Sequence, residues 1–323
     1  MSGDADRAAS SPIPVTVVGG YLGAGKTTLV NQLLRQAQGL RLAVLVNDFG
    51  ALPIDADLVE AQDGNVVSIA GGCVCCSYGS DLIAALMDLG RLQPRVEHVL
   101  IETSGVALPG QVASALTLLS DFVLDAVVTL VDAGAVRQQA QDVYLADTIL
   151  RQIGDAQLII LNKCDLVAEP ERAELETWLR AQAPTAGIVM ARQGAVPLPI
   201  VLGRRLAALD EAHPSARGHE HAAAHDAGPY VSRSIAISRA VDVAALATAL
   251  ADPTLGLLRA KGIVAGVDGS IQIVQLAGGR TSVAPAPPGQ PPRGLVVIGL
   301  AARTDLDRVE RMLHAASEAA AKA

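Results

Sequence analysis

Aromatic side chains are scarce in this sequence. Only 2% of its 323 residues are Phe, Trp or Tyr although half are hydrophobic, so the core must be built from Ala, Val, Leu and Ile. Long apolar runs are missing as well, and none approaches the roughly 20 residues that span a bilayer. The first residues, Met1–Asp6, are polar and lack the apolar segment of a signal peptide. These absences predict a cytoplasmic protein with no membrane partner.

Positive charge is not in excess either. The formal net charge of −8 does not indicate the excess of basic residues that binds nucleic acid, so we expect the partners to be proteins or small ligands. Cysteine is rare, but three of the four cysteines lie within four positions, at Cys73, Cys75 and Cys76. Because cytoplasmic thiols stay reduced, this cluster favours metal ligation over disulfide bonding.

Short apolar runs alternate with amphipathic stretches from Ile13 onward. Strands that are apolar on both faces and alternate with helices predict an α/β fold, a mainly parallel sheet covered on both sides. The expected strands are Val15–Val18, Leu42–Asn47, His98–Glu102, Ala126–Asp132, Leu158–Asn162 and Gly187–Met190. The expected helices are Thr27–Gln36, Asp81–Leu89, Gln111–Leu119, Val143–Ile153 and Pro170–Ala183.

Composition divides the chain into four parts. Residues 1–12 are expected to be a disordered tail, 13–210 the α/β domain, and 211–229 a linker rich in Ala, Gly, Pro and His. Residues 230–323 alternate in a way that predicts a smaller α+β domain with a mainly antiparallel sheet. Its expected elements are strands Ser234–Ser238, Ile263–Val267, Ile271–Leu276, Arg280–Ala284 and Leu295–Leu300, and helices Asp242–Leu250 and Asp305–Ala320.

A phosphate-binding motif, Gly-Tyr-Leu-Gly-Ala-Gly-Lys-Thr, connects the first expected strand to the first expected helix. Its glycines let backbone N–H groups converge on phosphate oxygens at a helix N-terminus. We expect Lys26 to bridge the β- and γ-phosphates and the Thr27 hydroxyl to ligate Mg²⁺. The expected nucleotide-binding residues of this segment are Gly20, Gly23, Ala24, Gly25, Lys26, Thr27 and Thr28.

An acidic residue, Glu102, ends the apolar strand Val99-Leu100-Ile101, as the second element of a nucleotide-hydrolysing site requires. Glu102 is expected either to hold a water bound to Mg²⁺ or to orient the attacking water. Gly105, three residues later, is expected to offer its N–H to the γ-phosphate.

A guanine-specific motif, Asn162-Lys163-Cys164-Asp165, closes a later strand. The Asp165 carboxylate can accept hydrogen bonds from both N1–H and the 2-amino group of guanine, a pair that adenine does not offer. Asn162, Lys163 and Asp165 therefore predict GTP rather than ATP as the nucleotide. Cys164 occupies the variable position of the motif and is expected to be an ordinary small buried residue.

Asp48 and Asp55 follow the second expected strand, where a switch loop would face the γ-phosphate. Either carboxylate is a candidate for positioning water or contacting a metal, and Asp48 is the stronger catalytic candidate. A turn that caps the end of the strand is an equal alternative for each of them.

The cysteine cluster lies in the polar segment Gly71-Gly72-Cys73-Val74-Cys75-Cys76. Three thiolates bind a soft or borderline ion such as Zn²⁺, Co²⁺ or Cu⁺ and leave the fourth tetrahedral position open, which favours metal exchange. Buried small residues or a redox pair are the alternatives. His219, His221 and His225 in the linker either buffer a metal or are simply solvated.

Taken in order, the motifs Gly-Tyr-Leu-Gly-Ala-Gly-Lys-Thr-Thr, Asn-Asp-Phe-Gly, Gly-Gly-Cys-Val-Cys-Cys, Glu-Thr-Ser-Gly and Asn-Lys-Cys-Asp resemble those of the CobW family of P-loop metallochaperone GTPases. The resemblance extends over essentially the whole chain. It implies a P-loop GTPase domain with a CobW-type C-terminal domain, Mg²⁺–GTP and a transition metal, often Zn²⁺, as ligands. The family's metal ligands fall on Cys73, Cys75 and Cys76. The chain departs from the family at Asp48 and Ala51, where many members have glutamates.

The leading hypothesis is a GTPase that delivers Zn²⁺ to a client metalloprotein in a nucleotide-dependent way. The alternatives are cobalt handling, for cobalamin synthesis or for a cobalt enzyme, and a GTP-regulated metal buffer without a delivery step. A homodimer that forms with nucleotide or metal is compatible with each of these hypotheses.

Overall fold

The computed structural model describes residues 11–47, 66–71, 80–203 and 229–320. The chain splits into two compact units, one formed by Pro12–Leu202 and the other containing Gly203–Ala323. Each unit is described by itself below.

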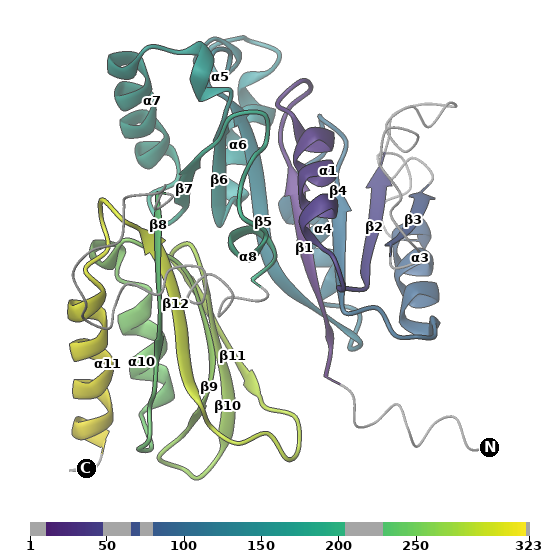
Figure 1. Ribbon diagram of the computed structural model, residues 1–323. Coiled ribbons are helices and arrows are strands. Elements are labelled where there is room, and N and C mark those ends of the chain that lie inside the picture. Colours follow the sequence, from purple (N-terminus) through teal and green to yellow (C-terminus); the bar gives the residue numbers. More distant parts are fainter. Residues whose placement is uncertain (1–10, 48–65, 72–79, 204–228, 321–323) are drawn as a thin grey trace. The chain divides into compact units, whose positions relative to one another are not determined.

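The first unit alternates strands and helices along its whole length (Figure 1). Its strands are β1 (Ile13–Gly19), β2 (Leu42–Asn47), β3 (Val66–Gly71), β4 (His98–Glu102), β5 (Phe122–Asp132), β6 (Leu158–Asn162) and β7 (Gly187–Met190). Its described helices are α1 (Lys26–Gln36), α3 (Ser80–Arg91), α4 (Pro109–Leu116), α5 (Val136–Gln139), α6 (Ala146–Asp155), α7 (Glu169–Gln182) and α8 (Leu198–Leu202).

The seven strands of this unit form one sheet in the order β3-β2-β4-β1-β5-β6-β7, and every neighbouring pair is parallel. The prediction of an α/β fold with a parallel sheet is thereby confirmed. Strand β1 is central, between β4 and β5. Because the strands are parallel, their carboxyl ends meet at a single edge, and the loops that leave this edge carry the predicted nucleotide-binding motifs.

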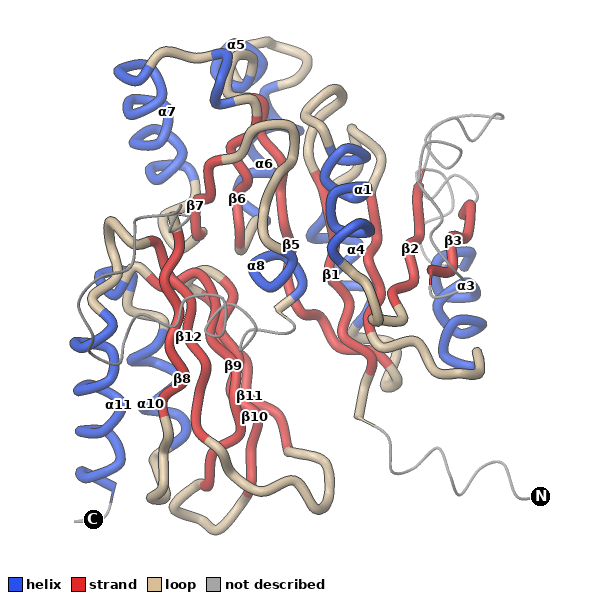
Figure 2. Tube along the Cα trace, in the orientation of Figure 1, coloured by secondary structure: helices blue, strands red, loops and turns tan. Residues whose placement is uncertain are grey.

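Helices cover both faces of the sheet (Figures 1 and 2). Helices α3 and α4 pack against β1, β2 and β4 around Val17, Ala43 and Ile101. Helices α6 and α7 pack against β5 and β6 on the same side, around Val131 and Leu161. Helix α1 lies on the opposite face. Both core clusters are almost purely aliphatic, as the scarcity of aromatic residues predicts.

Two elements of this unit differ from the expectation. Strand β3 was not expected, yet it pairs with β2 along its whole length, from Leu42↔Val66 to Asn47↔Gly71. Helix α6 begins at Ala146, not at Val143; the residues before it form a turn in which an Asp142 carboxylate oxygen accepts hydrogen bonds from the N–H groups of Tyr144 and Leu145.

The side chain of His98, the first residue of β4, makes a contact that the sequence analysis did not anticipate. It is fully buried in β4, and its Nε2 lies 2.9 Å from the Thr16 hydroxyl of β1. Thr16 in turn donates to the Asp125 carboxylate of β5 at 3.2 Å. The three side chains form a buried polar network across three neighbouring strands.

The described part of the second unit is an antiparallel sheet with two α-helices. Its strands are β8 (Tyr230–Ile235), β9 (Leu257–Ala265), β10 (Ile271–Ala277), β11 (Arg280–Pro285) and β12 (Gly294–Leu300), in the order β11-β10-β9-β12-β8. Helices α10 (Val243–Leu250) and α11 (Leu306–Ala320) pack on one face of the sheet around Leu246, Val297 and Val309. The antiparallel α+β domain is therefore present, although β9 begins six residues before the expected Ile263.

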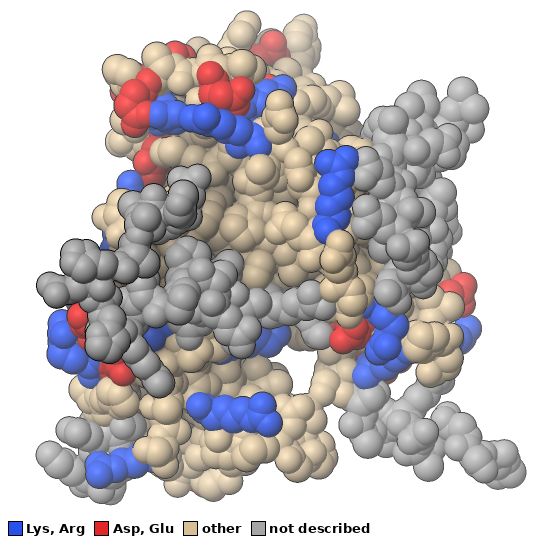
Figure 3. Space-filling model, viewed as in Figure 1, with Lys and Arg blue, Asp and Glu red and all other residues tan. Residues whose placement is uncertain are grey.

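Charged side chains are sparse and mixed in sign on the described surface seen in Figure 3. Within the described ranges, no helix combines the length and the apolar character needed to cross a bilayer.

Candidate functional site: a phosphate loop and a guanine motif

The phosphate loop connects β1 to α1 through three glycines with positive φ. These are Gly20 (φ 132°), Gly23 (φ 76°) and Gly25 (φ 103°), a backbone conformation that side chains of L-residues rarely adopt. At Gly20 a β-carbon would also lie 2.3 Å from the Leu130 carbonyl oxygen. The glycines thus allow the loop to fold tightly against β5 and to end at the N-terminus of α1, where backbone N–H groups bind anions.

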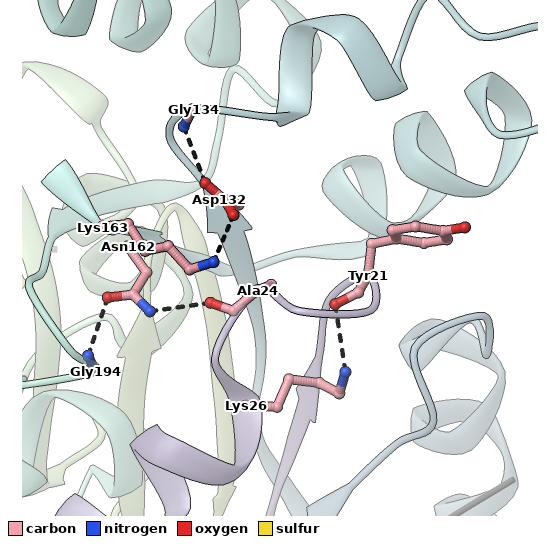
Figure 4. A network of polar contacts seen from close by, with 8 residues as sticks. All are labelled: Tyr21, Ala24, Lys26, Asp132, Gly134, Asn162, Lys163 and Gly194. Atoms are coloured by element: carbon pink, nitrogen blue, oxygen red, sulfur yellow. Dashed lines mark hydrogen bonds and ion pairs between the residues drawn. The ribbon is translucent and has the colours of Figure 1, made fainter. Parts of the chain in front are cut away.

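Lys26 begins α1 with its ammonium turned back into the loop. The Nζ atom donates to the carbonyls of Gly20 at 3.0 Å and Tyr21 at 3.4 Å, and the residue is only 9% exposed (Figure 4). The charge is therefore held at the centre of the loop, where the predicted bridge between the β- and γ-phosphates requires it. The next two residues differ in solvent exposure: Thr27 is half-buried and Thr28 is exposed.

Thr27 and Glu102 are brought together from two elements that are far apart in the sequence. The Thr27 hydroxyl donates to Glu102 Oε1 at 2.9 Å, and Glu102 is 2% exposed at the carboxyl end of β4. A hydroxyl beside a carboxylate is a pair of hard oxygen donors, which is the chemistry that Mg²⁺ prefers. The two residues fit the predicted magnesium site next to the phosphate loop.

The loop after Glu102 carries two buried hydroxyl groups, Thr103 Oγ1 and Ser104 Oγ. Neither has a hydrogen-bond partner among the described residues. Gly105 follows and packs against the phosphate loop, since a β-carbon there would lie 2.5 Å from a methyl group of Leu22. Its predicted N–H contact with a γ-phosphate is compatible with this position beside the loop.

Asn162 of the guanine motif connects three loops at the carboxyl edge of the sheet. Its side-chain N–H group donates to the Ala24 carbonyl at 2.9 Å, and its Oδ1 accepts from the Gly194 N–H at 3.0 Å (Figure 4). Asn162 is 2% exposed. The motif is thereby joined directly to the phosphate loop, so the two halves of a nucleotide site are held in one arrangement.

Lys163 and Asp165 complete the motif on the solvent side. Lys163 adopts a left-handed backbone (φ 60°), and its ammonium lies 2.7 Å from Asp132 Oδ2 at the end of β5. Asp165 is exposed in a short 3-10 helix, Cys164–Leu166, where its carboxylate is accessible to a guanine base.

The loop that follows β7 was missed by the sequence analysis. Its residues Gln193 (φ 49°) and Gly194 (φ 65°) both have positive φ, and Gly194 contacts both Asn162 and the backbone of α1 at Leu29. The glycine at position 194, four residues after the expected strand Gly187–Met190, is a turn signal that could have marked it. This loop borders the site together with the phosphate loop and the guanine motif.

Cys164 is a buried thiol. It is 2% exposed, its Sγ lies 3.0 Å from the Leu161 carbonyl to which it donates, and burial raises the pKa of the thiol. It is therefore poorly suited to bind a metal as a thiolate.

The predicted transition-metal ligands and switch residues lie outside the described residues. These are Cys73, Cys75, Cys76, Asp48, Asp55, His219, His221 and His225. Within the part of the chain that the structure describes, no group of three or more His, Cys, Asp or Glu side chains could hold a metal ion.

Comparison with known families gives two matches that together include most of the chain. Residues 14–190 match the CobW/HypB/UreG nucleotide-binding domain, and residues 230–317 match the cobalamin synthesis protein CobW C-terminal domain. The chain belongs to the CobW family. The family resemblance and the prediction of a P-loop GTPase are confirmed by these matches.

Curated CobW-family relatives include two proteins named zinc chaperone CobW. The protein from Sinorhizobium sp is 30% identical over 328 residues, a match that covers 93% of this chain and 88% of the relative. The protein from Pseudomonas aeruginosa is 34% identical over 241 residues, 65% of this chain and 64% of the relative. Among solved structures, the Zn(II)-bound YjiA GTPase from E. coli is 23% identical, with a TM-score of 0.43 and coverage of 95% of this chain and 99% of that chain.

Proposed function

We propose that this chain is a GTP-hydrolysing metallochaperone that binds Zn²⁺ through Cys73, Cys75 and Cys76 and delivers it to a client metalloprotein. The observation that carries the proposal is the pairing of Asn47 with Gly71 at the carboxyl ends of β2 and β3. One of these residues precedes the predicted switch segment, and the other precedes the cysteine segment.

The two segments therefore leave the sheet from adjacent points. Paired residues on neighbouring strands are about 4.8 Å apart, and β3 is three strand positions from β1, so Gly71 lies roughly 15 Å from the strand that carries the phosphate loop. Asp48 follows Asn47 directly, and Cys73 is two residues beyond Gly71. If the γ-phosphate orders Asp48, the change would be transmitted through the pair Asn47–Gly71 to the segment that contains the metal ligands.

The names of the relatives are the reason for choosing zinc as the metal. Two are named zinc chaperones, and a third, from Dictyostelium discoideum, is named a zinc-regulated GTPase metalloprotein activator. Three thiolates with an open fourth position suit Zn²⁺ that must be released again. The thiolates need a reducing compartment, which agrees with a cytoplasmic location.

The proposed site residues have distinct tasks in GTP hydrolysis. Lys26 neutralises charge between the β- and γ-phosphates. Thr27, with Glu102 beside it acting through a bound water, would hold a magnesium ion, which would supply positive charge to the phosphates. Asn162 and Asp165 bind the guanine base, while Gly105 faces the γ-phosphate. Asp48 positions the attacking water.

The test measures zinc and nucleotide affinity as a linked pair, with protein purified without a His tag. If a non-hydrolysable GTP analogue changes zinc affinity relative to GDP, zinc must change the affinity for the analogue by the same factor. A coupling of about 1–3 kcal/mol would appear as a shift of roughly 5- to 150-fold in both titrations.

Two variants make this test specific. Converting Cys73, Cys75 and Cys76 to Ser should abolish tight zinc binding and the coupling, while GTP binding in metal-free buffer persists. Cys164→Ser is the matched control, because a serine hydroxyl can still donate to the Leu161 carbonyl. Tight stoichiometric zinc binding by the triple variant would refute the assignment. GTP turnover that no zinc-accepting client accelerates would favour a metal buffer instead.

A further inference from the structure

The loop between β4 and α4 is contacted by a buried side chain of α6. Gln152 donates both of its amide hydrogens, one to the Gly105 carbonyl at 3.1 Å and one to the Ala107 carbonyl at 2.8 Å. Gln152 is only 1% exposed. Both donors of one buried amide are therefore used on the loop that directly follows Glu102.

The same helix fixes the far end of this loop. Asp155 lies one turn after Gln152, on the same face of α6, and its carboxylate accepts from the Gly110 N–H at 3.0 Å. A β-carbon at Gly110 would lie 2.5 Å from this carboxylate. Two side chains of α6 thus set the position of the loop from Gly105 to Gly110.

The hydrogen bond to Gly105 also fixes the direction of a backbone donor. In a trans peptide unit the C=O and N–H groups point in opposite directions. With the Gly105 carbonyl turned toward α6, the N–H of Val106 is turned away from α6. Gln152 also lines a cavity together with Tyr21 and Leu22 of the phosphate loop, so this orientation is set directly beside the phosphate site.

We propose that Gln152 is a positioning residue for GTP hydrolysis: it holds the Gly105–Ala107 backbone in the orientation that serves the γ-phosphate. This inference rests on the proposed GTPase function and assigns Gln152 a part in it. GDP lacks the γ-phosphate, so the hydrogen bonds of Gln152 should affect GTP far more than GDP.

The test compares Gln152→Met with Gln157→Met. Methionine keeps the approximate length of glutamine but donates no hydrogen bond. Gln157 lies just after α6, away from the loop, and provides the matched control, because its Oε1 also takes part in a side chain-to-backbone hydrogen bond and accepts from Val127 N–H at 2.8 Å.

We expect Gln152→Met to lower kcat by about tenfold or more and to weaken binding of a non-hydrolysable GTP analogue relative to GDP, since misplaced backbone donors stabilise the transition state poorly. Gln157→Met should leave kcat and this affinity ratio within about twofold of the wild type.

Gln152→Glu adds a second measurement, the pH dependence of kcat, which a purely structural role would leave unchanged. A buried carboxylate facing two carbonyl oxygens has a raised pKa, and only its protonated form can donate a hydrogen bond. The kcat of Gln152→Glu relative to the wild type should therefore rise as pH falls. The inference is overturned if Gln152→Met keeps the wild-type kcat, or if it weakens GDP and the GTP analogue equally. A wild-type protein without GTP turnover would overturn the proposed function as well.

Discussion

The Lys163 ammonium lies 2.7 Å from a carboxylate oxygen of Asp132, which joins the guanine motif after β6 to the end of β5. The other Asp132 oxygen accepts from the Gly134 N–H at 2.9 Å, so the carboxylate is fixed on both sides (Figure 4). Lys163 has a left-handed backbone, and this ion pair directs its side chain. Asp132 was not among the residues singled out from the sequence.

Removing this carboxylate should weaken the binding of guanine nucleotides moderately. The pair is partly exposed, with 35% exposure for the Lys163 side chain and 19% for that of Asp132, so we expect Asp132→Ala to weaken GDP binding by up to about fivefold, as for ion pairs worth about 0.2–1 kcal/mol. Titration with a fluorescent GDP derivative measures the change. Asp88→Ala, which removes an exposed ion pair with Arg91, is the control and should leave the affinity unchanged.

Asp165→Ala should abolish the preference for guanine. The variant loses two charge-assisted hydrogen bonds to the base, at about 1.5–3 kcal/mol each, while the phosphate loop stays intact. GTP binding should weaken by at least about tenfold, and ATP binding, already poor, should hardly change. Competition of both nucleotides against one fluorescent probe measures this. Equal affinity of the wild type for GTP and ATP would contradict the guanine assignment.

Thr27→Ala should raise the magnesium requirement of GTP hydrolysis. The change removes the hydroxyl that lies 2.9 Å from Glu102 and leaves the carboxylate in place, so excess Mg²⁺ should restore part of the rate. Lys26→Ala provides the contrast, because lost positive charge between the β- and γ-phosphates is not replaced by more magnesium. Initial rates measured over a magnesium titration separate the two variants. Equal rescue of both would contradict the assigned roles.

Thr16→Val should destabilise the first unit without touching the nucleotide site. Valine has nearly the same shape but removes the hydroxyl that links His98 to Asp125 in the middle of the sheet. Loss of a partner for buried polar groups costs about 1–3 kcal/mol in the free energy of unfolding. Urea denaturation followed by circular dichroism measures this, with Thr177→Val on the exposed surface of α7 as the control.

The site motifs could be predicted because each is local in the sequence. The loop from Gly20 to Thr27 and the motif from Asn162 to Asp165 contain, within a few residues, the groups that their chemistry needs. Most strands could be predicted for the same reason, since an apolar run of five to seven residues signals a strand buried on both faces.

The features that were missed depend on partners distant in the sequence. Nothing near His98 indicates Thr16 or Asp125, and nothing near Gln152 indicates Gly105 or Ala107. Strand β3 needs its partner β2 to be identified as a strand. The start of α6 was placed three residues too early, since Tyr144 and Leu145 lie in a turn after Asp142 and the regular helix begins at Ala146.

The central position of β1 determines when a nascent chain can first bind nucleotide. Val15 pairs with Val99 of β4, and Val17 pairs with Val127 of β5, so β1 has no sheet neighbour until β4 is made and lacks its second neighbour until β5 follows. At roughly 5–20 residues per second, this takes on the order of ten seconds after β1 itself is made. During that time the apolar side chains of β1 and β2 have no partners for burial and are candidate sites for chaperones that shield growing chains. The guanine motif, Asn162–Asp165, follows later still, so GTP can stabilise the chain only after synthesis has passed this motif.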